Sequence, residues 1–334
     1  MSLELYFASG QSREENVATL CKFCEENSNE FAISSKFTKD SKSFFVESLA
    51  GAIKVAKHDD YDYVYYLVDA LRICFREKVS LELAFEADVL GRLLQMLEID
   101  LELSISSNAN CTTNEEKMIS VILRCLTNSL YNDDIAVQIF ERTSGIQRVS
   151  AFLNKNISSS LSHLIVKILY MLGSRQGSIQ MVCQSARLST LKSLLRTALG
   201  DTNDQSRFSV IQVTCQLLNL LFSRCCVEYP WEDIYQINDC EMADEEFLLA
   251  PLMLSIIQMD SVDHCVSKEN VNEELNSMVA PLILKAEVHK CKEAAMQVYT
   301  NINKYALSAF SIIYLELFCF RFSCMPRKIR LFHL

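Results

Sequence analysis

The sequence predicts an all-α fold, an armadillo/HEAT-like right-handed superhelical solenoid of stacked helical repeats. Four apolar positions with the spacing of one helix face occur three times, and the second and third sets lie 42 residues apart. Glycine and proline are scarce, at 7 and 4 of 334 residues. A period near 42 with helical spacing is typical of such repeats, and few turn residues argue against sandwiches and barrels. The sets are Leu90, Leu93, Met96, Leu97; Ile146, Val149, Phe152, Leu153; and Leu188, Leu191, Leu194, Leu195.

The N-terminal elements follow from capping signals and apolar stripes. Ser12 and Glu15 have the spacing of a capping box, which predicts a first helix that continues through Leu20 and Phe23. The polar residues that follow predict a connection over 25–43. The next helices are predicted over 44–57, 61–77 and 82–98.

A polar insertion separates the first two sets, which lie 56 residues apart. Residues 104–116 read SISSNANCTTNEE, so this gap is one period plus an insertion. Thr113 and Glu116 form a second capping-box pattern. It predicts the start of a helix with an apolar stripe. The stripe comprises Ile119, Ile122, Leu123, Leu126 and Leu130.

Two further pairs of helical segments follow. The segment 146–153 precedes an apolar stripe over 161–172, and Gly173 is predicted as its C-cap. The segment 188–195 closes at Gly200–Asp204 and precedes a stripe over 210–221. No segment alternates with the period of two that strands require, which supports an all-α architecture.

The predicted organisation has three parts. Residues 1–226 form the armadillo-like repeats with the insertion 104–116, and residues 227–322 form a degenerate continuation with helices near 246–259, 270–292 and 293–322. Residues 323–334 form a basic tail, which is interpreted as an alternative or truncated terminus.

An apolar run over 305–320, YALSAFSIIYLELFCF, has two interpretations. A membrane anchor needs about twenty apolar residues. This run is shorter and contains Glu316, which favours a buried terminal helix. An anchor over 305–324 remains the alternative, and membrane association is otherwise expected to be peripheral at most.

Charge is distributed unevenly. The net charge is −10, which does not favour nucleic-acid binding. Residues 141–200 carry eight Lys or Arg against Glu141, whereas residues 227–278 carry thirteen acids against Lys268. This polarity indicates either a surface that steers a charged partner or the solvated faces of ordinary surface helices.

Cysteine usage and motifs indicate a protein without redox or catalytic chemistry. The fourteen cysteines lie mostly in apolar helical runs, and the N-terminus has no signal-peptide pattern, which predicts a reducing, cytoplasmic location. Cys21 and Cys24 form a CxxC without a second ligand pair nearby. No nucleotide-binding or nucleophile motif is present in the sequence. We therefore expect no catalytic residue, no metal and no cofactor.

Several segments together resemble the synembryn family. They are Leu71–Leu81 (LRICFREKVSL), the segment 90–99 with the acidic, serine-rich insertion after it, Leu123–Asn128 (LRCLTN), and the run 164–172. The resemblance covers about residues 15–225. Synembryns are armadillo-type cytosolic chaperones and guanine-nucleotide exchange factors for G-protein α subunits. Because they are longer, the resemblance implies a short form that lacks later repeats and a C-terminal clamping segment.

The resemblance implies a G-protein α subunit as partner, in receptor signalling in the cytoplasm or at the cell cortex. The concave face would bind the C-terminal helix of that subunit and stabilise its nucleotide-free state, which needs no catalytic residue. The last helix of an armadillo unit lines that face. The candidate contacts are Arg124, Asn128, His163, Lys167, Gln212, Gln216 and Asn219.

Each candidate contact has a structural alternative, which is a solvated helix face or a hydrogen bond between neighbouring units. That alternative weighs most for Asn128 and Asn219, which lie near repeat ends. At the level of function, the alternative is an armadillo scaffold or co-chaperone for another protein client, such as a myosin-directed or ciliary assembly factor.

Overall fold

The structure is a computed structural model, and it consists of two compact units, residues 1–217 (unit 1) and 218–334 (unit 2). Each unit is described by itself. The residues that the structure describes are 12–29, 39–57, 60–77, 88–106, 113–155, 157–201, 206–224, 249–259 and 286–302.

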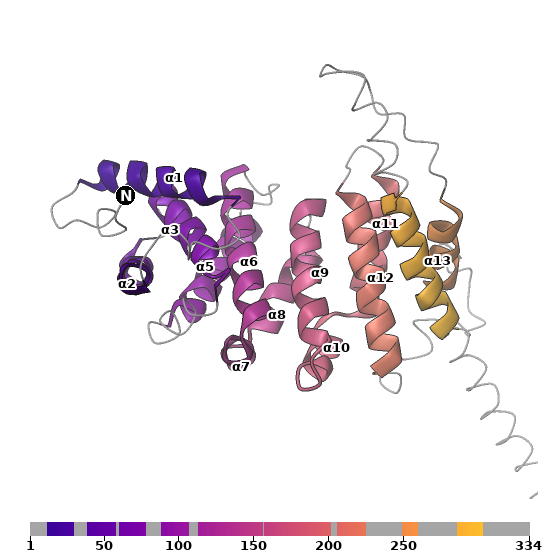
Figure 1. The fold of residues 1–334 in the computed structure, drawn as a ribbon. Helices are drawn as coiled ribbons and strands as arrows, with labels where there is room; N and C mark the ends of the chain where they lie inside the picture. The colour runs from indigo at the N-terminus through magenta and orange to yellow at the C-terminus, as the bar shows by residue number, and fades with distance from the viewer. Residues whose placement is uncertain are drawn as a thin grey trace, which may run out of the picture. The chain divides into compact units, whose positions relative to one another are not determined.

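Unit 1 is built of helices, and its described residues contain no strand, which confirms the all-α prediction. Helices α6 and α9 lie side by side in Figure 1, and α3 packs on α6. The helices are α1 (Arg13–Asn27), α2 (Lys39–Val55), α3 (Tyr61–Cys74), α5 (Val89–Ser106), α6 (Thr113–Asn132), α7 (Asp134–Arg142), α8 (Gly145–Ala151) with the 3-10 turn η3 (Phe152–Asn154), α9 (Ser159–Gly173), α10 (Ile179–Ser185), α11 (Leu188–Gly200) and α12 (Arg207–Arg224). Of α12, the residues up to Leu217 belong to unit 1.

The repeat comprises three helices, of which the sequence patterns revealed two. Helices α7, α8 and α9 form one repeat, and α10, α11 and α12 have the same order. The short first helices α7 and α10 were not predicted, because 9 and 7 residues are too few to carry a long apolar stripe. Between α7 and α8, a Cβ on Gly145 would come within 2.6 Å of the Phe140 ring, so this tight turn requires glycine.

Capping side chains begin several of these helices. At α1 the Ser12 hydroxyl accepts from the Glu15 N–H at 3.2 Å, and Glu15 accepts from the Ser12 N–H at 2.8 Å, which confirms the first capping box. Asp133 caps α7, and Ser158 caps α9. A cap of this kind contributes about 1 kcal/mol to helix stability.

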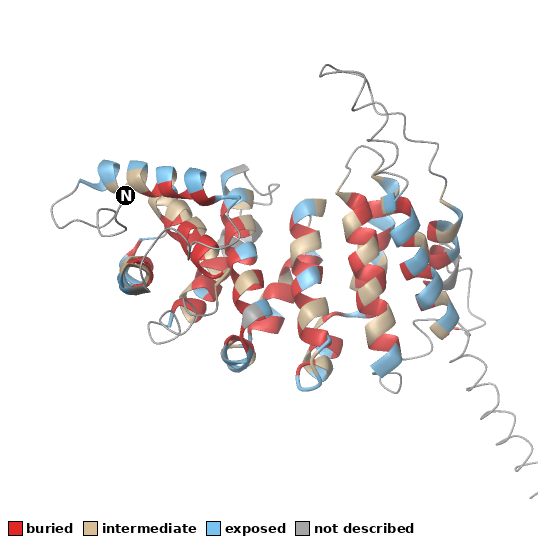
Figure 2. Cartoon of the chain, viewed as in Figure 1, coloured by how far each residue is buried: buried red, intermediate tan, exposed pale blue. Residues whose placement is uncertain are grey.

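The core contains the predicted apolar sets. Of the twelve repeated positions, all are buried except Leu194 on α11, which is half-buried. Figure 2 shows the buried residues where the helices face one another and the exposed residues on their outer sides. The spacing therefore correctly identified the packed faces of α5, of α8 with η3, and of α11.

Several predicted boundaries need correction. Gly173 is the last buried residue of α9, and the C-cap is Ser174, whose N–H donates to the Tyr170 carbonyl at 3.0 Å. The predicted connection 25–43 is shorter, because α1 extends to Asn27 and α2 begins at Lys39. Helix α5 extends to Ser106, into the predicted insertion, while α6 begins at Thr113.

Unit 2 contains the end of α12, helix α13 (Leu249–Gln258) and a helix over 286–302. The predicted boundary at 226, the acidic stretch over 227–248, most of the predicted helix 270–292, the apolar run 305–320 and the tail 323–334 lie outside the described residues. Among the described residues, no helix is both long and apolar enough to cross a membrane.

Candidate functional site

The last helix of each repeat places polar side chains beside two cavities of unit 1. Cavity A lies among α3, α6 and α9, and cavity B lies among α6, α9 and the first part of α12. Both are therefore bounded by the same type of helix, and α6 and α9 contribute to both.

Cavity A has a volume of about 330 Å³ and contains charges of both signs. Asp69 and Arg72 come from α3, and Glu116, Lys117 and Arg124 come from α6. Its lining is completed by uncharged residues. These are Tyr65, Ser120, Val121, Ser158, Ser160 and Leu161.

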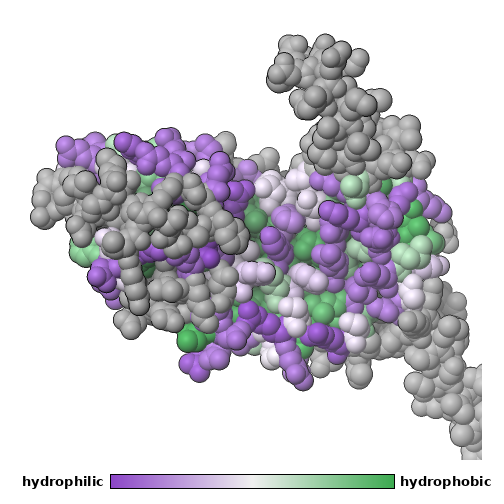
Figure 3. All heavy atoms as spheres, in the orientation of Figure 1, coloured by the Kyte–Doolittle hydropathy of each residue, from purple (hydrophilic) through white to green (hydrophobic). Residues whose placement is uncertain are grey.

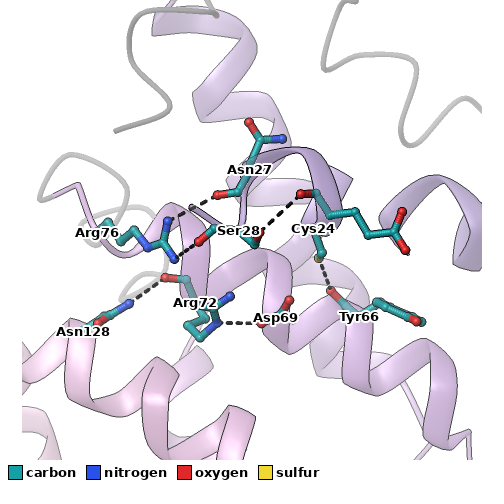
Figure 4. Close-up of polar contacts among 9 residues, drawn as sticks. Cys24, Asn27, Ser28, Tyr66, Asp69, Arg72, Arg76 and Asn128 are labelled. Atoms are coloured by element: carbon teal, nitrogen blue, oxygen red, sulfur yellow. Dashed lines mark hydrogen bonds and ion pairs between the residues drawn. The ribbon is translucent and has the colours of Figure 1, made fainter. Parts of the chain in front are cut away.

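The charges of cavity A are partly used to hold the helices together. Arg72 Nε donates to Asp69 Oδ1 at 2.6 Å, and both side chains are 15% exposed. In Figure 4 the Asn128 amide, from α6, donates to the Arg72 carbonyl at 2.9 Å. Arg76 continues this network, because it donates to the carbonyls of Asn27 and Ser28 at the end of α1, at 3.3 and 2.7 Å. The last carbonyls of a helix need such donors.

Cavity B is larger, about 460 Å³, and differs in charge. Lys167 is the one formal cation among the described residues that line cavity B, and none of these residues is acidic. The lining is rich in amides and aromatic hydroxyls. It comprises Thr127, Asn128, Tyr131, His163, Lys167, Tyr170, Met171, Ser209, Gln212, Val213 and Gln216.

His163 is the titratable group of cavity B closest to neutral pH. Burial lowers the pKa of its imidazole below the ordinary value near 6.5, and the positive charge of Lys167 adds to this effect, while the backbone of Ser209 opposes it. Its Nδ1 atom is buried and has no hydrogen-bond partner among the described residues. The surroundings of the imidazole therefore favour its neutral form, and the ring carries a buried polar atom without a partner among the described residues.

Five of the seven predicted contact residues line cavity B, namely Asn128, His163, Lys167, Gln212 and Gln216. Arg124 is exposed and lines cavity A instead. Asn219 belongs to unit 2, where it accepts from the Asn301 amide at 2.6 Å and donates to Gln297 at 3.3 Å. Asn128 and Asn219 thus both form hydrogen bonds between helices, which is the structural alternative to contact with a partner.

The sequence patterns did not single out Tyr131 and Tyr170, the aromatic residues of cavity B. Tyr131 is 73% exposed at the end of α6, and Tyr170 is half-buried on α9. Tyr65 on α3 packs edge-on against Tyr66 with ring centroids 5.2 Å apart. An aromatic residue in an apolar stripe has the same pattern as a core residue, so only the fold separates the two.

Of the two cysteines of the CxxC motif on α1, Cys24 lies in a setting unsuited to thiolate chemistry. Cys24 is buried, and its Sγ lies 3.8 Å from the Tyr66 carbonyl (Figure 4). Burial raises the pKa of the Cys24 thiol far above its ordinary value, and Asp69 adds to the shift. In the described part of the chain, no three His, Cys, Asp or Glu side chains are grouped closely enough to hold a metal ion.

Figure 3 shows hydrophilic and hydrophobic residues mixed over the face of α6 and α9 rather than gathered into one apolar patch. The cavities add hydrogen-bonding groups at defined positions, which can fix the register of an extended segment.

Comparison with known proteins establishes the fold. No family model and no curated protein matches the chain. It is similar to an engineered protein of a structural genomics consortium, with 14% identity over 91% of this chain and 99% of that one, at a TM-score of 0.56. A designed armadillo repeat protein is 12% identical over 90% and 98%, at 0.54. Computationally designed armadillo proteins for modular peptide recognition are 13% identical over 87% and 98%, at 0.52. The chain is therefore an all-α repeat solenoid of the armadillo type.

Proposed function

We propose that unit 1 is a protein-binding scaffold that holds a segment of a partner in cavities A and B. The observation that carries this proposal is the row of last helices, α3, α6, α9 and the start of α12, whose polar side chains line both cavities. Binding at such a surface requires complementary groups and no catalytic residue. The designed relatives support this use of the fold, since one was made for modular peptide recognition and another is in complex with a peptide.

An exposed aromatic side chain supports the proposal. Tyr131 lines cavity B and is 73% exposed. Large side chains of this kind carry much of the binding energy in protein interfaces, especially tyrosine. Amides from Asn128, Gln212 and Gln216 can pair with the backbone of a bound segment while Tyr131 supplies contact area.

Within this function, we propose a G-protein α subunit as the partner, on the basis of the synembryn-like segments. Two of these segments lie beside cavity A: the described residues 71–77 of the first are on or next to α3, and Leu123–Asn128 is on α6. The scaffold would bind the C-terminal helix of the α subunit more tightly in its nucleotide-free state. GDP release then follows from this difference in affinity, as population shift requires. The alternative is a scaffold or co-chaperone that binds another client.

The test is a pull-down of GDP-bound α subunits by the purified chain, with and without an excess of a GTP analogue. The proposal predicts binding that the analogue abolishes. Absence of binding in every nucleotide state would contradict the α-subunit assignment and leave the scaffold role to be tested with other clients.

The variants R124E and K167E locate the surface. Arg124 and Lys167 are exposed and line cavities A and B respectively, so reversal of either charge should weaken binding with little effect on folding. Lys54, which is exposed on α2, provides the matched control K54E. Binding unchanged by R124E and K167E would place the partner elsewhere.

A further inference from the structure

The charges around cavity B define which chemical class of segment it can accept. Lys167 is exposed on α9, and His163 lies one helical turn before it on the same helix. No carboxylate lines this cavity among the described residues that surround it. A cationic ligand group would therefore meet Lys167 without a counter-charge, whereas a carboxylate would gain an ion pair and a hydrogen-bond donor.

We propose that cavity B is a carboxylate-binding subsite, in which Lys167 and protonated His163 together hold an acidic side chain of the bound segment. The inference rests on the proposed function, since it assigns the chemistry of the segment that cavity B receives. Cavity A does not share this selectivity, because Asp69 and Glu116 stand beside its three cations.

The surroundings of His163 make carboxylate binding dependent on pH. The residues that line cavity B with it are Thr127, Asn128 and the titratable Tyr131 from α6, and Ser209, Gln212 and Gln216 from α12. The other basic groups on these helices do not line cavity B: Lys117 and Arg124 line cavity A, Arg207 donates to the Asp201 carbonyl at 2.9 Å, and Arg224 is the last residue of α12. Lys167 is thus the charge that opposes protonation of His163.

A bound carboxylate would shift the His163 pKa in the opposite direction. In the free protein, burial and Lys167 hold the His163 pKa low. A carboxylate placed between the two groups neutralises Lys167 and accepts a hydrogen bond from the imidazolium. By linkage, the ligand raises the His163 pKa, and a lower pH strengthens ligand binding. Glutamate remains mostly ionised at about pH 5.8, since its ordinary pKa is about 4.3.

The test uses three fluorescent octapeptides, (Ser-Glu)4, (Ser-Gln)4 and (Ser-Lys)4, with binding to the full chain measured by fluorescence anisotropy. We expect (Ser-Glu)4 to bind most tightly and to bind about threefold more tightly at about pH 5.8 than at about pH 7.8. K167M should weaken its binding about threefold, as expected for an exposed charge pair. H163Q should abolish the pH dependence, and K54M should change neither property.

A second readout follows His163 directly. The chain has five histidines, so the His163 ring signal is assigned by its loss in H163Q, and its pKa is measured by NMR with and without (Ser-Glu)4. The inference predicts a higher pKa in the complex. Circular dichroism confirms that each variant is folded.

Three results would overturn the inference. They are equal or tighter binding of (Ser-Gln)4 or (Ser-Lys)4, a pH dependence that persists in H163Q, and no binding of (Ser-Glu)4 at up to about 1 mM. None of them contradicts the proposed function, which the pull-down decides separately. Conversely, carboxylate-selective binding without α-subunit binding would support this subsite and point to another acidic client.

Discussion

Cavities A and B share two helices but use their polar side chains differently. In cavity A, Arg72 is paired with Asp69, and its carbonyl accepts from Asn128, so part of the polar lining joins α3 to α6. In cavity B, His163 has a buried Nδ1 without a partner among the described residues, and Lys167 is exposed. The same repeated backbone thus provides a mixed-charge, internally paired surface at cavity A and, at cavity B, a surface with one exposed cation and no carboxylate among its described lining residues.

The largest effect is expected from a substitution in the core of α9, the helix that borders both cavities. Ile165 is fully buried on α9, which borders both cavities. We expect I165A to lower the free energy of unfolding by about 3 kcal/mol, because truncation leaves a cavity in a packed core. Denaturant unfolding measures this loss. A loss below about 1 kcal/mol would show that α9 does not support the two cavities as a packed element.

The next largest effect is expected on partner binding, with little change in stability. Tyr131 is 73% exposed, so Y131A should leave stability within about 0.5 kcal/mol of the wild type. It should weaken partner binding by about 1.4 kcal/mol, or tenfold, if the ring is an anchor at cavity B. Ile135 lies close by on α7 but does not line the cavity, so I135A is the control. Equal losses in the two variants would contradict a special role for cavity B.

A smaller effect is expected from breaking the ion pair of cavity A. D69N leaves the half-buried Arg72 without its charged partner, so we expect stability to fall by about 1 kcal/mol. Binding of (Ser-Glu)4 should not change, because Asp69 does not line cavity B. A loss of peptide binding in D69N, measured by anisotropy, would mean that the two cavities act as one.

The smallest effect concerns pH and stability. Because the folded state holds the His163 pKa below its ordinary value near 6.5, the unfolded chain binds more protons between these two values. The contribution of His163 to stability is therefore complete above about pH 6.5 and decreases as pH falls below it. The fall in melting temperature on acidification should be smaller in H163Q. An identical fall would show that His163 is not responsible.

The sequence predicted the packed faces of the fold better than the surface of the site. The spacing at Leu90, Ile146 and Leu188 identified buried helix faces, because burial requires apolar residues at helical intervals. Helices α7 and α10 escaped prediction because they are short, at 9 and 7 residues; Asp133 caps α7, whereas no side chain caps α10.

The residues of the site likewise divide into those whose placement the sequence predicted and those whose placement it did not. Position on a last helix was enough to place His163, Lys167, Gln212 and Gln216 together at cavity B. Arg124 has the same helical setting but faces cavity A, since the direction of a side chain depends on its place in the helical turn. The pairing of Asp69 with Arg72 and the exposure of Tyr131 depend on neighbouring helices, which no local pattern contains.

The most direct test of the central claim, that the row of last helices is the partner-binding surface, is site-specific photo-crosslinking. A benzoylphenylalanine replaces either Gln212, which lines cavity B, or Gln138, which is exposed on α7 away from both cavities. The chain is then irradiated with a GDP-bound G-protein α subunit. We predict a crosslinked product from position 212 and none from position 138. Crosslinking from position 138 alone would contradict the claim.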